Sequence, residues 1–206
     1  HQLHRRQRQM CIRDRFNMNG FKENSSATYH LLAEALRKGH HARSRYVGDP
    51  GFFDVPINDL INKKHAQEYA RQIEFNKATP ASEVKPLEVI QESKDTTHYS
   101  IIDNEGNAVS NTYTLGYSFG SGVTIPGTGI LMNNQMNNFA FQYGDQAEVS
   151  RSSSPGNRFI PGKRPMSTMN PVIVKNKDNN ISIITGSPGG SFIPAAALRV
   201  ITGIID

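Results

Sequence analysis

The periodicity of the apolar residues changes abruptly at Thr96, and this change constrains the fold more than any other feature of the sequence. Upstream of it, apolar residues recur at helical spacing over residues 25–39 and 59–76. Downstream, short segments are strand-like until a last helical segment at residues 193–205. Helices, then strands, then a helix predict an α+β domain with an antiparallel sheet.

The two upstream helices are predicted from their start and stop signals. Ser25 or Ser26 is placed to cap the first helix, because a serine hydroxyl accepts a hydrogen bond from a free backbone N–H. Gly39 is typical of a helix end. Residues 45–56 are rich in turn formers, and residues 78–95 contain prolines and no clear period. We expect this last stretch to be an extended linker.

Five segments after Thr96 are strand candidates. Residues 98–103 and 108–115 flank an Asn-Glu-Gly-Asn turn and predict a β-hairpin. Residues 171–175 and 181–185 predict a second strand pair, again joined by a turn, and residues 129–133 are a further short candidate. The stretches between these segments are expected to be loops.

Composition excludes several classes of protein. The chain is 36% hydrophobic and 20% charged, as ordinary globular proteins are, and no run approaches the roughly 18 apolar residues of a membrane span. The single cysteine, Cys11, excludes an internal disulfide and a cysteine-based zinc site. His40 and His41 lie in a loop-like setting with no carboxylate spaced to complete a metal site. We therefore expect neither a metal nor a cofactor.

The positive charge of the chain is concentrated at its start. Residues 1–15 contain five arginines and one aspartate, and so carry four of the five net positive charges. The segment has no apolar stretch, so it is not a secretory signal, and its string QMCIRDR resembles translated sequencing-adaptor sequence. We expect a basic extension foreign to the fold. The alternative is an arm that binds nucleic acid in a salt-sensitive way. Its cations would be Arg5, Arg6, Arg8, Arg13 and Arg15.

Six short motifs occur in order along residues 17–206. Each is weak alone, but in this order and spacing they resemble the γ-glutamyltranspeptidase family of N-terminal-nucleophile hydrolases. The resemblance implies an αββα four-layer sandwich, incomplete in this chain. The motifs are YVGDP at 46–50, TTHYS at 96–100, FGSG at 119–122, GILMNNQM at 129–136, KRPMSTM at 163–169 and GSPGGS at 186–191.

The resemblance also implies an inactive precursor that cuts itself once, between Asp95 and Thr96. Residues 16–95 would then be the C-terminal tail of a large subunit, and residues 96–206 the N-terminal part of a small catalytic subunit, paired with each other. The rest of the large subunit, with its carboxylate-binding arginine, and the end of the small subunit are expected outside this chain. An inactive fragment is therefore one alternative.

The chemistry explains why a threonine is needed at the junction. In the precursor its hydroxyl can attack the Asp95 carbonyl through a five-membered ring, and water hydrolyses the resulting ester. The freed α-amino group, which titrates at about 7.7–8.0, can then serve as the base for the Thr96 hydroxyl. The resemblance places an oxyanion hole on Gly189 and Gly190 and makes Thr114 a hydrogen-bond partner of the nucleophile. His98 is expected to be structural.

The donor site departs from the family pattern. The resemblance places a γ-glutamyl donor's α-carboxylate on Ser167 and Thr168, and its α-ammonium near Gln135 and Asn138. Asn138 stands where an aspartate is usual, so a charge-assisted bond is replaced by a weaker neutral one. Gly116 stands where asparagine or glutamate is common, so a further polar contact is lost. These changes leave Thr96 untouched but weaken the expected affinity for ordinary donors.

The implied function is that of a γ-glutamyl hydrolase and transferase that passes the γ-glutamyl group of glutathione and related amides to water or to amino acids. Gly116 and Asn138 motivate an alternative in the same superfamily, an amidase like the cephalosporin and glutaryl acylases. The resemblance implies a periplasmic or secreted enzyme. The loop at residues 139–162 has the length of a family lid, and Phe141, Tyr143 and Phe159 could cover the site; a surface loop is the alternative.

Overall fold

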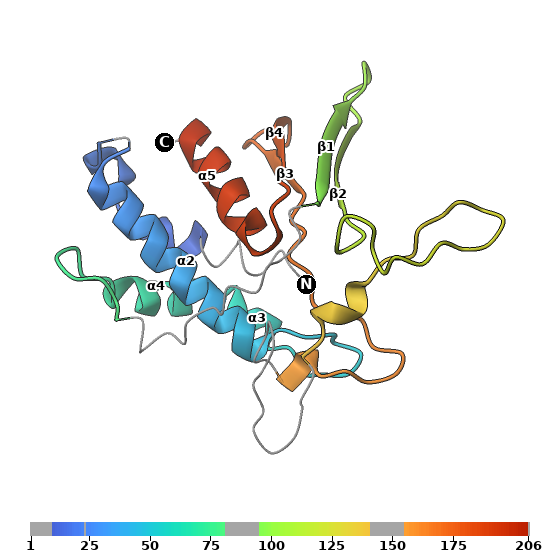
Figure 1. The fold of residues 1–206 in the computed structure, drawn as a ribbon. Helices are drawn as coiled ribbons and strands as arrows, with labels where there is room; N and C mark the ends of the chain where they lie inside the picture. Colours follow the sequence, from blue (N-terminus) through green and yellow to red (C-terminus); the bar gives the residue numbers. More distant parts are fainter. Residues whose placement is uncertain (1–9, 23, 81–94, 141–154, 206) are drawn as a thin grey trace. The chain divides into compact units, whose positions relative to one another are not determined.

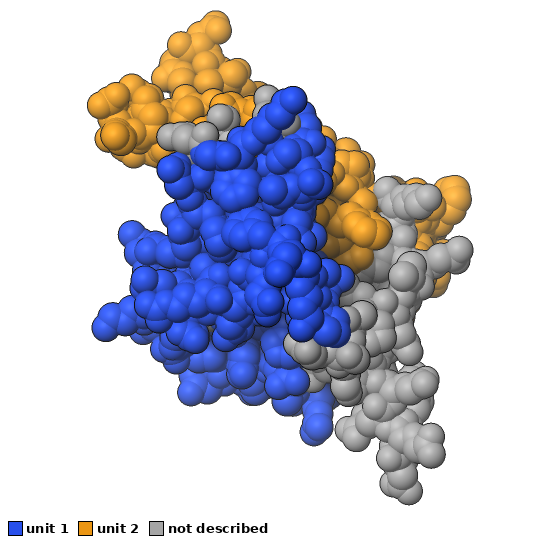
Figure 2. Space-filling model, turned by 90° about the vertical axis from the view of Figure 1, so that its left-hand side faces the viewer, with its two compact units in different colours: residues 1–88, 139–166, 206 blue, residues 89–138, 167–205 orange. Residues whose placement is uncertain are grey.

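The computed structural model describes residues 10–22, 24–80, 95–140 and 155–205. The chain divides into two compact units, coloured separately in Figure 2. Unit 1 contains residues 1–88 and 139–166, and unit 2 contains residues 89–138 and 167–205. Each unit is described by itself.

Unit 1 is built on a long helix, α2 (Ser26–Tyr46), shown in blue in Figure 1. Ser25 caps it, because its hydroxyl accepts the Thr28 N–H at 3.3 Å. The predicted end at Gly39 is wrong, since the helix runs seven residues further. A helical glycine costs only about 1 kcal/mol relative to alanine, and the next turn buries Ala42 in return.

The same extension corrects the setting of the two adjacent histidines. His40 and His41 lie within α2 and not in a loop. Burial lowers the pKa of His41, and the nearby cations Arg45 and Lys38 lower it further. The imidazole is therefore neutral at neutral pH.

The second predicted helix is divided into two shorter ones. The structure has α3 (Ile57–Leu60) and α4 (Lys63–Arg71) where one helix was expected over residues 59–76. The break lies at Asn62, whose side chain accepts the Lys64 N–H at 2.8 Å and caps a new helix. This local cap competes successfully with continued helix.

Two clusters of buried apolar residues stabilise unit 1. The first includes Ile12, which is fully buried although it belongs to the segment expected to be foreign to the fold. Arg13, one of the arginines of the basic segment, is also buried and bonds Asp14 at 2.9 Å. The origin of this segment stays a prediction, and Arg5, Arg6 and Arg8 lie outside the described residues. The first cluster consists of Ile12, Leu31, Ala35, Ala66, Ala70 and Ile73; the second consists of Ala42, Val47, Val55, Leu60 and Met166.

In its described residues, unit 2 contains two antiparallel hairpins and one α-helix. The first hairpin pairs β1 (Thr97–Ile102) with β2 (Ala108–Tyr113), as predicted. The second pairs β3 (Val172–Lys175) with β4 (Ile181–Thr185), and α5 (Ile193–Ile205) lies beside it (Figure 1). This combination of helices and antiparallel strands is the expected α+β architecture.

The strand predicted at residues 129–133 does not form. Within this stretch the structure has an isolated bridge between Leu131 and Thr124 in place of a strand. Gly127 and Gly129 both have positive φ, at 77° and 71°, so the loop turns on itself and cannot extend.

Ser110 joins the two hairpins of unit 2. The Ser110 hydroxyl, on β2, donates to the Thr185 carbonyl at 3.1 Å and accepts the Val172 N–H at 3.0 Å. It therefore contacts β4 and β3 together, where those strands pair with each other.

No helix in the described part of the chain has the length and apolarity needed to cross a bilayer.

Candidate active site

Thr96 lies immediately before β1, at the open end of the first hairpin. The pairing of Thr97 with Tyr113 places Thr96 opposite Thr114 by continuation of the antiparallel register. Residues directly opposite each other point to the same face of a sheet, so both threonines share a face with His98 and Thr112. Thr96 is 9% exposed, so the hairpin presents a nearly buried hydroxyl residue at this end.

His98 fixes this face of the hairpin. One ring nitrogen lies 2.8 Å from the Thr112 hydroxyl and the other lies 3.2 Å from the Ser100 hydroxyl. Burial lowers the pKa of His98, so the ring is neutral at neutral pH. These contacts give His98 a structural position within the hairpin.

The ring of His98 also packs on the glycine turn that follows β4. A Cβ built on Gly186 would lie 2.3 Å from two atoms of the imidazole, so only glycine fits there. Ser110 contacts Thr185, the residue before Gly186. Ser110 and His98 therefore place Thr185 and Gly186, where the glycine turn begins, against the hairpin face that also carries Thr96.

The glycine turn carries two consecutive residues in the left-handed region. Gly189 has φ of 117° and Gly190 has φ of 55°, which side chains rarely tolerate. The chain then enters a short 3₁₀ turn, Gly190–Phe192, and the helix α5. Backbone N–H groups at the start of a helix favour negative charge, so this turn is suited to an oxyanion.

Gln135 connects the end of β2 with the polar 3₁₀ turn at Gln135–Asn138. Its side-chain amide donates to the Thr114 carbonyl at 3.4 Å, and its oxygen accepts a hydrogen bond from the Asn138 side chain. Thr114 in turn accepts the Gly116 N–H through its hydroxyl at 3.0 Å. The structure thus brings Thr114, Gly116, Gln135 and Asn138 together, next to the position of Thr96.

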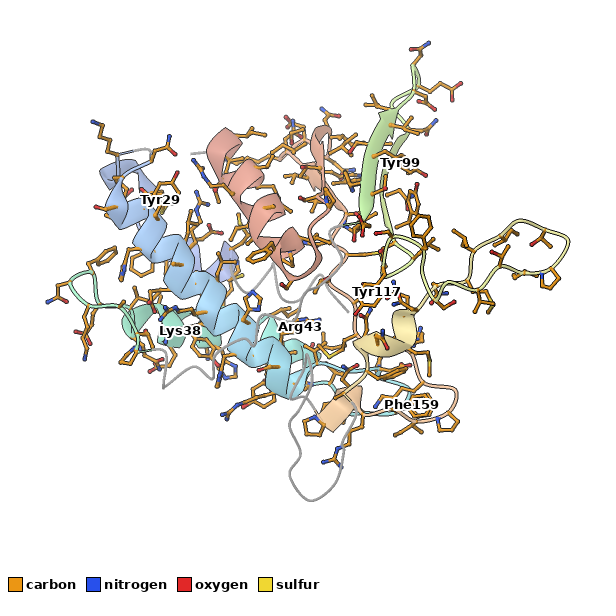
Figure 3. All side chains as sticks on the ribbon, in the orientation of Figure 1. Tyr29, Lys38, Arg43, Tyr99, Tyr117 and Phe159 are labelled. Carbon is orange, nitrogen blue, oxygen red and sulfur yellow. The ribbon has the colours of Figure 1, made fainter. Side chains whose placement is uncertain are left out.

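The space beside Gly116 is filled by another side chain. A Cβ at Gly116 would lie 1.8 Å from the Asn134 side-chain oxygen, and Gly116 has φ of 97°. That oxygen accepts the Tyr117 N–H at 3.0 Å; Tyr117 lies just beyond the end of β2 in Figure 3. A larger residue at position 116 would therefore require Asn134 to move.

Ser167 and Thr168 lie a few residues before β3 and are both half-buried. The Ser167 hydroxyl accepts the Met169 N–H at 3.2 Å, which forms a local turn. Because Val172 pairs with Thr185, the chain enters β3 at the end of the hairpin from which the glycine turn leaves β4. The two hydroxyl residues therefore precede β3 at that end, and their role stays a prediction.

Two contacts near Thr96 were not anticipated from the sequence. The Ser118 hydroxyl donates to the carboxylate of Asp95, the residue on the acyl side of the expected cut. Asn134 supports the loop after β2, as described above. Both contacts join residues that are far apart in the chain. They could have been predicted only if the conformation of the loop at residues 114–118 had been known.

Of the three aromatic residues expected in a lid, only Phe159 lies in the described part of the chain. Phe141 and Tyr143 lie outside the described residues. Phe159, labelled in Figure 3, belongs to unit 1, where it packs edge-on against the buried Phe139 with ring centroids 5.3 Å apart. Across the described ranges, no three histidine, cysteine, aspartate or glutamate side chains are grouped to hold a metal ion.

Comparison with known proteins places these features in a family. The family model described as γ-glutamyltranspeptidase matches residues 7–206. The glutathione hydrolase proenzyme of Escherichia coli (strain K12) is 41% identical over 196 residues, covering 95% of this chain and 34% of that protein. The acylase ACY 1 proenzyme of Pseudomonas sp. (strain SE83) is 37% identical over 182 residues, covering 88% of this chain and 30% of that protein.

A solved structure supports the same relationship at the level of the fold. The cephalosporin acylase from Bacillus halodurans superposes with a TM-score of 0.74 at 24% identity, covering 100% of this chain and 34% of that chain. This chain spans about a third of the length of the curated relatives that it matches. The match over residues 7–206, together with the relatives' identity, shows that the chain belongs to the γ-glutamyltranspeptidase family.

Proposed function

We propose that the protein is a γ-glutamyl hydrolase and transferase that cuts itself between Asp95 and Thr96 and then uses Thr96 as its nucleophile. The observation that carries this proposal is the position of Thr96, nearly buried just before β1, opposite Thr114 and on the hairpin face against which the glycine turn begins. A hydroxyl nucleophile and backbone N–H donors are the two requirements of acyl transfer. Glutathione and related amides would donate the γ-glutamyl group to water or to amino acids.

The self-cleavage step uses groups that the chain supplies. The Thr96 hydroxyl attacks the Asp95 carbonyl carbon, the C–N bond of the peptide breaks, and the nitrogen becomes a free α-amino group. Water then hydrolyses the ester, which frees the Thr96 hydroxyl again and leaves Asp95 with a C-terminal α-carboxylate. The bond from Ser118 to Asp95 supports this step by fixing the residue on the acyl side.

In the mature enzyme, the α-amino group of Thr96 would act as base, directly or through water. Thr114 would orient the hydroxyl, and the N–H groups of Gly189 and Gly190 would stabilise the oxyanion. Gln135 and Asn138 would contact the donor's ammonium, and the Asn134 side chain fills the space beside Gly116. Ser167 and Thr168 would hold the α-carboxylate.

The whole protein would pair a large subunit, ending with residues 16–95, with a small subunit beginning at Thr96. An exposed apolar face on β1 and β2 supports the finer proposal of a four-layer αββα sandwich, because such faces are normally covered. Tyr99, labelled in Figure 3, lies on this face and packs edge-on against Tyr113. The exposed apolar residues of this face are Tyr99, Ile101, Val109 and Tyr113.

The resemblance to the family extends the proposal to an enzyme of the periplasm or the extracellular space.

The test is hydrolysis of two anilides by the full-length protein. A γ-glutamyl anilide carries the α-ammonium, and a glutaryl anilide lacks it. We expect faster hydrolysis of the γ-glutamyl compound. Faster hydrolysis of the glutaryl compound would replace this proposal by the acylase alternative, which Gly116 and Asn138 favour. Hydrolysis of neither would refute both.

Replacing Asn138 by aspartate is expected to raise the preference for the γ-glutamyl donor about tenfold, because a charge-assisted bond to the ammonium replaces a neutral one. The Gln135 amide can turn its nitrogen toward the new carboxylate at the cost of its 3.4 Å hydrogen bond to the Thr114 carbonyl. The measurement is kcat/KM for both anilides. The exposed neighbour Asn137→Asp adds the same charge and is the control. An equal gain for the glutaryl anilide would show that the ammonium is not bound there.

A further inference from the structure

Residues from both sides of the proposed cut meet within unit 1. Asp49 lies upstream of the Asp95–Thr96 bond and Arg164 lies downstream. The Arg164 side chain donates to the two oxygens of Asp49 at 3.1 and 2.8 Å, and its backbone N–H donates at 2.9 Å. The Gly51 N–H adds a fourth donor at 3.1 Å. Two-point binding of a carboxylate by a guanidinium is among the stronger polar contacts in proteins.

The Asp49 carboxylate is enclosed while its partner remains accessible. The side chain of Asp49 is 3% exposed and that of Arg164 is 73% exposed. The hydrogen bonds from Arg164 hold the pKa of Asp49 well below its usual range, so the carboxylate stays ionised at any working pH. Lys163, the preceding residue, adds a second positive charge near Asp49.

Close backbone packing reinforces the ion pair. A Cβ on Gly48 would lie 2.4 Å from the Gly156 carbonyl oxygen, and a Cβ on Gly156 would lie 2.6 Å from the Phe53 ring. Gly48 and Phe53 are upstream of the proposed cut and Gly156 is downstream. The two segments therefore touch without an intervening side chain.

A buried apolar contact and a hydrogen bond within the downstream segment add to these contacts. Met166 is buried in the cluster formed by Ala42, Val47, Val55 and Leu60 of the upstream piece. The side-chain oxygen of the buried Asn157 accepts the Met166 N–H at 2.9 Å. This bond fixes the downstream segment in the shape that presents Arg164 and Met166 to the same partner.

We propose that residues 155–166 and residues 42–60 form a noncovalent joint that holds the two pieces together after the backbone is cut, with the Asp49–Arg164 ion pair as its polar anchor. The inference rests on the proposed cleavage at Asp95–Thr96. It adds the contact by which a tail of the large subunit stays attached. The chemistry of that contact is a buried carboxylate on the upstream piece, captured by a guanidinium on the downstream piece.

The test cuts the chain independently of Thr96. A site-specific protease sequence is inserted between Lys94 and Asp95 of this chain, Thr96 is replaced by alanine, and the purified protein is cut with that protease. Association of the two pieces is followed by native mass spectrometry and size-exclusion chromatography across a urea series. We expect the cut pieces to stay together in the absence of urea.

Variants of the ion pair are expected to weaken this association. Arg164→Met, at an exposed side chain that leaves the core intact, should raise the dissociation constant about tenfold or more. Asp49→Asn should do the same, and Arg164→Lys should fall between, because lysine keeps the charge but loses the two-point geometry. The exposed residues Asp54 and Arg158 provide matched controls, Asp54→Asn and Arg158→Met, which should leave the association unchanged.

Either of two results would overturn the proposal. The pieces of the unsubstituted chain could separate as soon as they are cut, or Arg164→Met could associate as tightly as Arg158→Met. Because the protease makes the cut, a full-length protein that fails to cleave itself would refute the proposed function and leave this joint standing.

Discussion

Replacing Thr96 by alanine in the full-length protein is expected to lower kcat/KM for a γ-glutamyl anilide by at least about a thousandfold, because the nucleophile and its hydroxyl are lost together. Thr96→Ser should keep a measurable fraction of the activity, since serine retains the hydroxyl. Both variants are best supplied as two separate chains that begin and end at the proposed cut, so that self-cleavage is not required.

The adjacent threonine provides the control for this prediction. Thr97 is exposed and points to the opposite face of β1, so Thr97→Ala should leave kcat/KM within a few-fold of the parent. Comparable activity in Thr96→Ala and Thr97→Ala would mean that another group performs the attack. Loss of activity in Thr96→Ser as well would point to a requirement for the threonine methyl group.

Replacing Gly48 by alanine is expected to destabilise unit 1 by about 3 kcal/mol, near the upper end of overpacking effects. The added methyl would lie 2.4 Å from the Gly156 carbonyl oxygen and 2.7 Å from two further backbone atoms of Gly156. Gly156 cannot retreat, because its other side packs on the Phe53 ring. The measurement is the free energy of unfolding from a urea titration.

Gly51 is the matched control for Gly48, since it belongs to the same turn. A methyl at Gly51 would meet its nearest neighbour, the Asp49 carboxylate, at an ordinary 3.5 Å. Gly51→Ala should therefore change the free energy of unfolding by less than about 0.5 kcal/mol. Equal stability of Gly48→Ala and Gly51→Ala would contradict the close packing of the two segments.

The sequence predicted elements correctly where a local signal and the tertiary packing agree. The hairpin of β1 and β2 has alternation on both sides of a strong turn, and its bounds differ from the prediction by only a residue or two. The prediction ended helix α2 too early, at Gly39, because the burial of Ala42 in the next turn depends on residues distant in the sequence. The strand expected at residues 129–133 failed because two glycines turn that loop back.

The candidate site shows the same division. The pairing that sets Thr96 opposite Thr114 follows from the hairpin turn, so sequence patterns carry it. The contacts of Ser118 with Asp95 and of Asn134 with Gly116 depend on how a loop folds back onto the hairpin. The Asp49–Arg164 pair joins residues 115 apart, and no periodic pattern connects them. The roles of Ser167 and Thr168 stay predictions.

The measurement that tests the central claim most directly is the intact mass of the purified protein during incubation, beside a Thr96→Ala control. The account predicts two masses that correspond to cleavage of the Asp95–Thr96 bond, found only when the threonine is present. This test is made on the full-length protein as well as on the chain of 206 residues. A full-length protein that remains a single uncut chain, or a Thr96→Ala variant that is cut at the same bond, would contradict it.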